Sequence, residues 1–372
     1  MEKSDFMALK AGIVGLPNVG KSTLFNAITK KHILAANYPF ATIEPNIGVV
    51  EVPDERLDYL NELYNPKSLV AAAFEFTDIA GLVKGASKGE GLGNKFLSHI
   101  REVDAIVNVV RCFENSEITH VEGDLDPIRD IEIIKTELIL SDLEQIDNRI
   151  QKLGKKMDMA QTKPEKMEAA ALRKAKAILE SDTVLRMGDL SKEDLEALKS
   201  FNLITLKPTI YVANVSDDDA IVGDNKYSEI VKEYAEKEGS GVIVMSCELE
   251  SQLSDYEKEE KENFLKELGI SNSGLDRLIY ETYSLLGLRT YFTAGPKEVR
   301  AWTFRNGMTA PECAGIIHTD FEKGFIRAEV MSYDALVEYG TELKVKEAGK
   351  MRLEGKEYKM QDGDICYFRF NV

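Results

Sequence analysis

The feature that most constrains this chain is a glycine-rich segment near its amino terminus, Gly15-Leu16-Pro17-Asn18-Val19-Gly20-Lys21-Ser22-Thr23. It follows an apolar run over residues 11–15, which predicts a strand, and it opens a predicted helix over residues 23–31. Glycines let the backbone curl so that consecutive N–H groups point at a phosphate, and the helix amino terminus adds positive potential. The segment therefore predicts a nucleotide-binding P-loop, in which Lys21 reaches the β- and γ-phosphates and Ser22 holds Mg²⁺. The residues assigned to the nucleotide here are Asn18, Val19, Gly20, Lys21, Ser22 and Thr23.

The composition indicates a soluble globular protein with room for two or three domains. The chain has 372 residues, of which 44% are hydrophobic and 30% charged. No apolar run approaches the roughly 20 residues that a bilayer crossing needs, and the amino terminus carries no apolar signal segment, so a cytoplasmic location is expected. A net charge of −17 argues against broad coating of DNA or of an anionic membrane, because counterion release needs basic surface. The four cysteines stand far apart, which predicts small apolar residues rather than a metal site or a disulfide framework.

The order of the predicted strands and helices divides the chain into three parts. Short apolar runs alternate with amphipathic stretches over residues 1–125 and again over 207–288, which predicts one α/β sheet domain interrupted by an insertion. Residues 126–206 lack strand alternation, and apolar residues recur at steps of four and three from Ile139 to Met157, which predicts a helical coiled-coil hairpin. Residues 289–372 return to short strands and one short helix, which predicts a small mixed α+β domain. The predicted strands of the sheet domain are residues 11–15, 47–52, 73–78, 105–110, 209–214 and 241–246.

A second motif, Asp78-Ile79-Ala80-Gly81, stands at the end of a predicted strand and has the DxxG pattern of GTPase-type P-loop proteins. Asp78 is expected to position a Mg²⁺-bound water, and the Gly81 amide to bond the γ-phosphate. Thr42 lies between the two motifs, where the threonine of the first switch loop is expected to reach the metal. Leu82 stands where Ras-like enzymes carry the glutamine that orients the attacking water, so hydrolysis is slow, another group positions the water, or a cation supplies the missing charge stabilisation. His99, on the next predicted helix, is a candidate for this role, with a packed or surface histidine as the alternative.

Base selection is expected at Asn214-Val215-Ser216-Asp217, at the end of the predicted strand 209–214. Guanine readers carry an NKxD loop here, in which the asparagine bonds the base, the lysine stem packs over it and the aspartate accepts two guanine protons. Val215 replaces that lysine, but Asp217 is retained, so guanine is not excluded. Ser246 and Cys247 follow the last predicted strand of the sheet, in the place of the loop whose backbone amide reads the base.

Four segments together make the chain resemble the YchF subfamily of Obg-like ATPases over nearly its whole length. They are the P-loop, residues 37–46, residues 78–94 and residues 295–303. The resemblance implies a G domain over 1–125 and 207–288, a coiled-coil insertion over 126–206 and a TGS domain of β-grasp type over 289–372. It also implies Mg²⁺-dependent binding of ATP in preference to GTP, slow hydrolysis to ADP and phosphate, and association with the ribosome. Members usually carry glutamate where this chain has Asp217, and related enzymes that lack the glutamine use the P-loop asparagine, here Asn18, to hold K⁺.

The predicted hairpin carries local basic charge that suits contact with RNA. From residue 149 to 176 there are nine basic residues and three acidic ones, and we expect this tip to contact ribosomal RNA phosphate, with a solvated helix surface as the alternative. The basic residues are Arg149, Lys152, Lys155, Lys156, Lys163, Lys166, Arg173, Lys174 and Lys176.

The sequence favours a nucleotide-dependent switch that associates with ribosomes and regulates translation or the stress response. Two alternatives stay open: an Obg-type GTPase, and a ribosome- or RNA-binding module whose nucleotide turnover is incidental. Neither a membrane nor sequence-specific DNA is expected as a partner.

Overall fold

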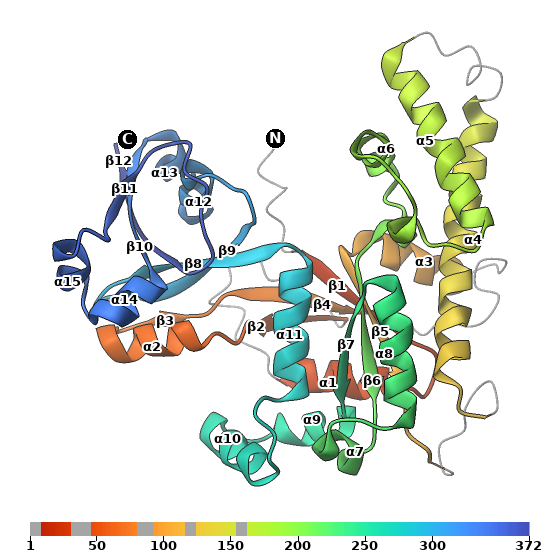
Figure 1. Ribbon diagram of the computed structural model, residues 1–372, viewed down its shortest axis with the longest axis horizontal. Coiled ribbons are helices and arrows are strands. Elements are labelled where there is room, and N and C mark those ends of the chain that lie inside the picture. Colours follow the sequence, from red (N-terminus) through yellow and green to blue (C-terminus); the bar gives the residue numbers. More distant parts are fainter. Residues whose placement is uncertain (1–8, 31–45, 80–91, 116–123, 154–161, 372) are drawn as a thin grey trace.

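The computed structural model of the protein describes residues 9–30, 46–79, 92–115, 124–153 and 162–371. Within these ranges the chain forms two six-stranded sheets, a helical hairpin that projects beside the first sheet, and a C-terminal domain built on the second (Figure 1). No helix in this part of the chain combines the length and apolar character required to cross a membrane. Several residues singled out by the sequence lie outside the described ranges, namely Thr42, Gly81, Leu82, Lys155 and Lys156.

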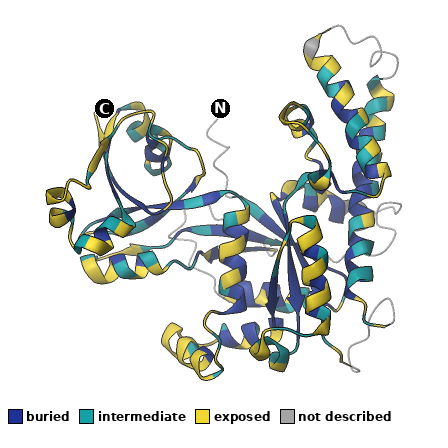
Figure 2. Cartoon of the chain, in the orientation of Figure 1, coloured by how far each residue is buried: buried dark blue, intermediate teal, exposed yellow. Residues whose placement is uncertain are grey.

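The first sheet is the predicted nucleotide-binding core. It contains β1 (Lys10–Val14), β2 (Ile47–Glu51), β4 (Ala73–Asp78), β5 (Ala105–Arg111), β6 (Thr209–Asn214) and β7 (Gly241–Met245), in the order β2-β4-β1-β5-β6-β7. These bounds confirm the predicted strands to within one residue at either end. All neighbours are parallel except β2, which runs antiparallel to β4 at the edge of the sheet. The strands β5 and β6 are buried along their whole length, as expected where helices cover both faces of a parallel sheet (Figure 2).

Alternate residues of the first sheet face two different helix layers. Ile210 and Val212 of β6 lie in one apolar cluster with residues of α1 (Lys21–Lys30) and α11 (Gly274–Leu285). Tyr211 and Ala213 lie in another cluster with residues of α8 (Lys226–Glu238) and of the first turns of α4 (Pro127–Leu153). Because side chains alternate along a strand, these two sets of helices cover opposite faces. The other helices around this sheet are α3 (Leu92–Glu102), α7 (Asp217–Val222), α9 (Cys247–Leu253) and α10 (Lys258–Glu267).

The insertion is a helical hairpin whose long helix packs in two separate apolar clusters. Leu138 of α4 packs in the core of the first sheet, whereas Ile146 joins a separate cluster with Leu172 and Leu179 of α5 (Lys163–Glu180). At about 1.5 Å per residue, the 27 residues of α4 extend about 40 Å. Figure 1 shows the hairpin rising well beyond the sheet. The chain returns to the sheet through α6 (Lys192–Leu198) and 3₁₀ turns at Leu185–Met187, Lys199–Phe201 and Ile204–Leu206.

The second sheet takes strands from two distant parts of the chain. It contains β3 (Leu69–Val70), β8 (Leu288–Ala294), β9 (Val299–Arg305), β10 (Phe325–Ser332), β11 (Arg352–Glu354) and β12 (Asp364–Phe370), in the order β11-β10-β12-β8-β9-β3. Tyr291 faces α12 (Ala310–Ile317) and α13 (Thr319–Lys323), and its neighbour Phe292 faces α14 (Tyr333–Tyr339), α15 (Glu342–Glu347) and α2 (Glu55–Tyr64). Since α2 and β3 come from residues 55–70, the amino-terminal part of the chain contributes both a strand and a covering helix to the C-terminal domain. The sequence did not predict this link.

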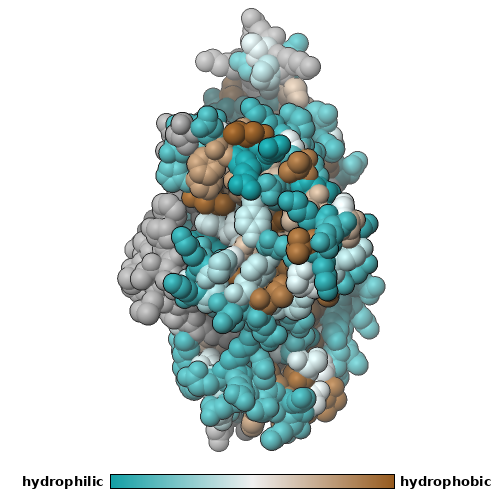
Figure 3. All heavy atoms as spheres, turned by 90° about the vertical axis from the view of Figure 1, so that its left-hand side faces the viewer, coloured by the Kyte–Doolittle hydropathy of each residue, from teal (hydrophilic) through white to brown (hydrophobic). Residues whose placement is uncertain are grey.

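The surface of the C-terminal domain is mainly hydrophilic on the face that Figure 3 shows. Exposed apolar side chains appear there in small separate groups rather than as one continuous patch. Single exposed apolar residues are normal on soluble proteins and identify no interaction site by themselves.

Candidate functional site

The P-loop lies at the carboxyl end of β1 and connects this strand to α1. The backbone takes positive φ angles at Asn18 (63°) and Gly20 (100°), which produce the tight curl that the glycine-rich sequence predicts. Gly20 also allows a close approach, because a Cβ atom there would lie 2.2 Å from Asn214 Nδ2. The Leu24 amide then donates a hydrogen bond to the Gly20 carbonyl at 2.9 Å as α1 begins. Val19 is buried beneath the loop.

Lys21 and Asp78 form an ion pair at the centre of the site. Lys21 is the first residue of α1, Asp78 is the last residue of β4, and Lys21 Nζ contacts Asp78 Oδ1. The two side chains are 11% and 24% exposed, so a ligand that approaches from solvent can reach both. Ser22 is exposed in the first turn of α1, and Thr23 beside it is half-buried. The structure therefore brings the predicted lysine, hydroxyl and carboxylate to one edge of the sheet.

The donor set at this edge suits a hard cation. The Ser22 hydroxyl and the Asp78 carboxylate are oxygen ligands of the kind that Mg²⁺ binds together with the phosphates of a nucleotide. Among the residues that the structure describes, no group of three or more His, Cys, Asp or Glu side chains forms a metal site of its own. A cation at this edge therefore depends on a nucleotide, on water or on residues outside the described ranges for its remaining ligands.

Asn214 ties the P-loop to the loop that follows β7. Its buried side chain donates from Nδ2 to the Val19 carbonyl at 2.9 Å, and its Oδ1 accepts from the Cys247 amide at 2.9 Å. The sequence predicts that Asn214 contacts the nucleotide base, and that a backbone amide in the loop of Ser246 and Cys247 does so as well. In the structure the Asn214 oxygen and the Cys247 amide bond each other, so they hold three loops of the site together.

Asp217 and Ser246 form the second contact between the loops after β6 and β7. Ser246 Oγ donates to Asp217 Oδ1 at 2.5 Å and accepts from the Leu249 amide at 3.1 Å, which caps α9. Asp217 opens α7, so its carboxylate is held at the rim of the site. Val215, in the place of the expected lysine, is 2% exposed and packs in the apolar cluster that contains Cys112. Its side chain thus supports the loop from below.

The cysteines of the chain are buried, as their spacing predicts. Burial raises the pKa of the Cys247 thiol well above its usual value, which keeps the thiol protonated at neutral pH. Burial has the same effect on the pKa of Cys112. Cys247 therefore contributes packing and its backbone amide to the site, and no thiolate chemistry.

Two residues of α3 have different environments. His99 is exposed, whereas Phe96 and Ile100 on the same helix are buried, so His99 occupies the surface position that the sequence left open as an alternative. Arg101, in the last turn, donates from Nη1 to Asp142 Oδ1 at 3.0 Å and from Nη2 to Ser141 Oγ at 2.8 Å. The helix that follows the second motif is thereby bonded to the long helix of the insertion.

Asp142 is one of several buried ionisable residues that the sequence did not predict. Its side chain is 0% exposed, and besides Arg101 it accepts from the amides of Ile204 at 3.0 Å and Thr205 at 2.8 Å and from the Thr205 hydroxyl at 2.7 Å. These contacts join α3, α4 and the returning end of the insertion. The available signal was an aspartate placed directly beside Leu143 in the apolar seam of α4.

Comparisons with known proteins agree along the length of the chain. The family model described as 50S ribosome-binding GTPase matches residues 10–156, and the model of the C-terminal domain of YchF GTPases, described as a protein of unknown function, matches residues 288–371. The ribosome-binding ATPase YchF of Bacillus subtilis is 58% identical over 98% of this chain and 100% of that protein. Obg-like ATPase 1 of Oryza sativa is 48% identical over 98% of this chain and 92% of that protein. The structure of the Schizosaccharomyces pombe YchF GTPase matches with a TM-score of 0.86 at 45% identity, covering 97% of this chain and 98% of that one.

Proposed function

Because this chain belongs to the YchF family of Obg-like P-loop proteins, we propose that it binds ATP with Mg²⁺ and hydrolyses it slowly to ADP and phosphate. Relatives from Bacillus subtilis and Haemophilus influenzae are named ribosome-binding ATPases, and we extend both properties to this chain. It then acts as a nucleotide-dependent switch that associates with ribosomes in the cytoplasm and regulates translation or the stress response. The observation that carries the proposal is the convergence of Lys21, Ser22 and Asp78 at the carboxyl edge of the first sheet.

The nucleotide replaces the ion pair between Lys21 and Asp78. The amides of the P-loop and the amino terminus of α1 bind the phosphates, and Lys21 turns from Asp78 to the β- and γ-phosphate oxygens. Ser22 and Asp78 would hold Mg²⁺, directly or through water. We assign the remaining contacts to the metal and the γ-phosphate to Thr42 and Gly81, which lie outside the described residues. When bound, Mg²⁺ would neutralise the charge that develops during phosphoryl transfer.

Slow hydrolysis follows from Leu82, because an apolar side chain cannot orient the attacking water. We assign the charge stabilisation that remains to K⁺ held by Asn18, which stands in the left-handed conformation at the exposed turn of the P-loop. Replacing potassium by sodium at constant ionic strength is then expected to lower the rate of ATP hydrolysis. An unchanged rate argues against the assignment to Asn18.

Substitution of the P-loop lysine tests the nucleotide site. Lys21→Ala is expected to abolish ATP binding and any nucleotide-dependent ribosome association. Lys30→Ala is the matched control, since it removes another lysine of α1. Lys30 lies at the far end of this helix from the P-loop and pairs with Asp255 at 2.8 Å. If Lys21→Ala binds ribosomes as the unmutated protein does, with and without ATP, the chain is a ribosome-binding module with incidental turnover.

Base selection is a separate part of the proposal, in which ATP is preferred and GTP binds more weakly. One observation favours the alternative of a GTPase. Ser246 holds the Asp217 carboxylate at the rim of the site, and a carboxylate complements the N–H groups of guanine. Equilibrium titration of the nucleotide-free protein with ATP and GTP, each with Mg²⁺, separates the two. A preference of about tenfold, or about 1.4 kcal/mol, for ATP supports the ATPase, and a similar preference for GTP requires the GTPase.

The ribosome contact is assigned to the basic hairpin and the C-terminal domain. Part of the basic charge is used within the protein, since Arg149, Lys174 and Lys176 pair with Glu168, Asp194 and Asp147 at 2.6–2.8 Å. Among the described side chains of the hairpin, Lys152 and Lys166 remain for RNA phosphate.

Charge reversal tests this assignment. The double variant Lys152→Glu and Lys166→Glu is expected to weaken ribosome co-sedimentation and to flatten its dependence on salt, because each lost phosphate contact removes about one released counterion. A variant with the same change of net charge, Lys237→Glu and Lys266→Glu, serves as the control on exposed helix faces of the sheet domain. Equal loss in both variants points to net charge rather than to the hairpin.

A further inference from the structure

Two strands at the edge of the first sheet form a ribbon that leads away from the nucleotide site. β2 and β4 pair antiparallel in unbroken register, from Ile47 opposite Thr77 to Glu51 opposite Ala73. At one end of the ribbon the Asp78 amide donates to the Asn46 carbonyl at 2.8 Å, while the Asp78 carboxylate pairs with Lys21. At the other end the Val52 amide donates to the Ala72 carbonyl at 2.8 Å. The continuous ladder makes the ribbon a stiff connector of about 17 Å, at about 3.4 Å per residue.

The far end of the ribbon is built into the C-terminal domain. β3 pairs with β9 in parallel, the Val299 amide donates to the Ser68 carbonyl at 3.0 Å, and the Lys67 amide donates to the Pro296 carbonyl at 3.3 Å. α2, which lies between β2 and β3, packs in the same apolar cluster as residues of α14 and α15. Figure 1 shows α2 directly beneath the C-terminal domain and at the end of the ribbon. The ribbon is therefore attached to the C-terminal domain by backbone pairing through β3 and by apolar packing through α2.

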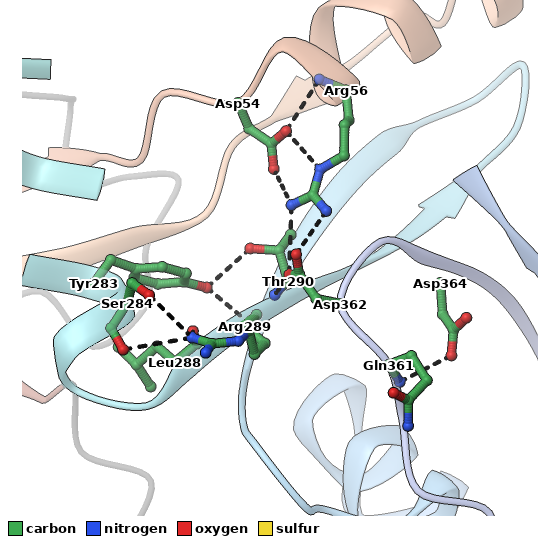
Figure 4. A network of polar contacts seen from close by, with 10 residues as sticks. All are labelled: Asp54, Arg56, Tyr283, Ser284, Leu288, Arg289, Thr290, Gln361, Asp362 and Asp364. Carbon is green, nitrogen blue, oxygen red and sulfur yellow. Dashed lines mark hydrogen bonds and ion pairs between the residues drawn. The ribbon is translucent and has the colours of Figure 1, made fainter. Parts of the chain in front are cut away.

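Arg56 is the charged centre of this junction (Figure 4). Its Nε and Nη2 bond the two carboxylate oxygens of Asp54 at 2.9 and 2.8 Å, and its Nη1 bonds Asp362 Oδ2 at 2.8 Å. Asp362 also accepts from the Thr290 amide at 2.9 Å, and the guanidinium lies 5.3 Å from the centre of the Phe292 ring. Arg56 thus joins the residue that caps α2 to strand β8 and to the loop that precedes β12.

The C-terminal domain has a second attachment through α11. This helix packs against β7 and runs directly into β8. The Tyr283 hydroxyl donates to the Arg289 carbonyl at 2.9 Å and lies 3.1 Å from Thr303 Oγ1. Burial raises the pKa of Tyr283 to about 12, so the hydroxyl stays a neutral donor. The two attachments meet at Thr290, whose hydroxyl lies 3.0 Å from the Tyr283 hydroxyl and whose amide donates to Asp362 at 2.9 Å (Figure 4). A shift of the ribbon relative to α11 therefore acts on β8 at this one position.

We propose that the β2–β4 ribbon couples the nucleotide at Asp78 to the orientation of the C-terminal domain, with Arg56 as the positioning residue at the junction. The coupling rests on the proposed function, in which the nucleotide and Mg²⁺ separate Asp78 from Lys21. ATP and ADP then favour different positions of the ribbon. Coupling of this kind is reciprocal, so weakening the junction changes the relative affinity of the site for the two nucleotides.

The test compares the dissociation constants of ATP and ADP, each with Mg²⁺, for the unmutated full-length protein and for Asp362→Asn. This substitution keeps the shape of the side chain and an acceptor for the Thr290 amide but removes the charge that binds Arg56. We expect the ratio of ATP to ADP affinity to change by about fivefold or more, the lower end of typical allosteric coupling. Arg369→Gln is the control, because it breaks an exposed pair with Glu329 at 3.0 Å within the same domain and is expected to leave the ratio unchanged.

The possible outcomes are distinguishable. An unchanged ratio in Asp362→Asn, whether or not its thermal stability falls, makes the junction purely structural and overturns the coupling. If the unmutated protein binds neither nucleotide, the proposed function is overturned and the coupling falls with it. If Asp362→Asn does not fold, Arg56→Lys takes its place under the same expectations, because lysine keeps the charge but cannot bond both carboxylates in the same way.

Discussion

Replacement of Asp142 by alanine is expected to destabilise the protein through loss of a single buried acceptor group. The carboxylate is 0% exposed and accepts four hydrogen bonds, from Arg101, the Ile204 amide and both the amide and hydroxyl of Thr205. A buried donor left without an acceptor costs about 1–3 kcal/mol, and breaking a buried charge pair costs about 3–5 kcal/mol. The cost of the unpaired donors and the cost of the broken charge pair both include Arg101, so they are not added in full. Arg101 is also 22% exposed and can bond water, so we expect a loss of about 3–4 kcal/mol in the free energy of unfolding.

Thermal unfolding followed by calorimetry measures this loss. At about 2.1 cal/mol/K per residue, a chain of this length has an unfolding entropy near 0.8 kcal/mol/K, so the midpoint is expected to fall by about 4–5 °C. Hydrogen exchange at the Ile204 and Thr205 amides should also accelerate, because these amides lose their acceptor. Asp147→Ala is the control on the same helix, since its pair with Lys176 is largely exposed and its loss is expected to change little. If Asp142→Ala lowers the midpoint no further than Asp147→Ala, the reasoning from buried acceptors is wrong.

Three further predictions concern the site and its surroundings. Gly20→Ala is expected to remove ATP binding, because the added Cβ would lie 2.2 Å from Asn214 Nδ2; a normal ATP titration would contradict the close packing of the two loops. Burial raises the pKa of Glu250, so the folded state holds the proton more tightly and loses stability as pH rises through the usual carboxyl range and beyond. Glu250→Gln should therefore gain stability relative to the unmutated protein as the pH rises above about 4, the usual pKa of a glutamate, and parallel pH profiles of the unfolding free energy would refute this. His99→Ala should leave the rate of ATP hydrolysis unchanged because the side chain is exposed on α3, and a large loss would make His99 a catalytic residue.

The sheet domain could be predicted from the sequence because its signals are local. Each strand is a short apolar run bounded by loop residues, and β4, β5 and β6 begin where the sequence predicts. The P-loop is a continuous segment between a strand and a helix, so its place at the carboxyl end of β1 could be predicted, as could the position of Asp78 at the end of a strand. The direct pairing of Lys21 with Asp78 was not predicted. The signal for the hairpin was also local, because the periodic apolar residues of α4 predicted its contact face. Ile146 packs against apolar residues of α5, as that periodicity predicts.

The contacts that complete the site could not be predicted, because they join residues far apart in the chain. Asn214 bonds a carbonyl 195 positions earlier, and Asp142 bonds amides 62 and 63 positions later. The strand β3 has two residues, and Leu69 is 41% exposed, so no hydrophobic pattern marks it. Sequence patterns report the environment of a segment and not the identity of its partner, which is why the roles of these residues emerge only in the folded structure.

The strand that β3 adds to the C-terminal sheet has a consequence for fragments of the protein. A fragment that begins at residue 288 retains β9 but lacks the strand that pairs with its outer edge, so a row of backbone N–H and C=O groups becomes available. It also lacks α2, whose apolar side chains share a cluster with Leu336 and Val345. Such a fragment is expected to associate edge to edge at high concentration, and a soluble version requires residues 54–70 to be supplied as a fused or separate peptide. The smallest independent form of this domain is therefore discontinuous in sequence.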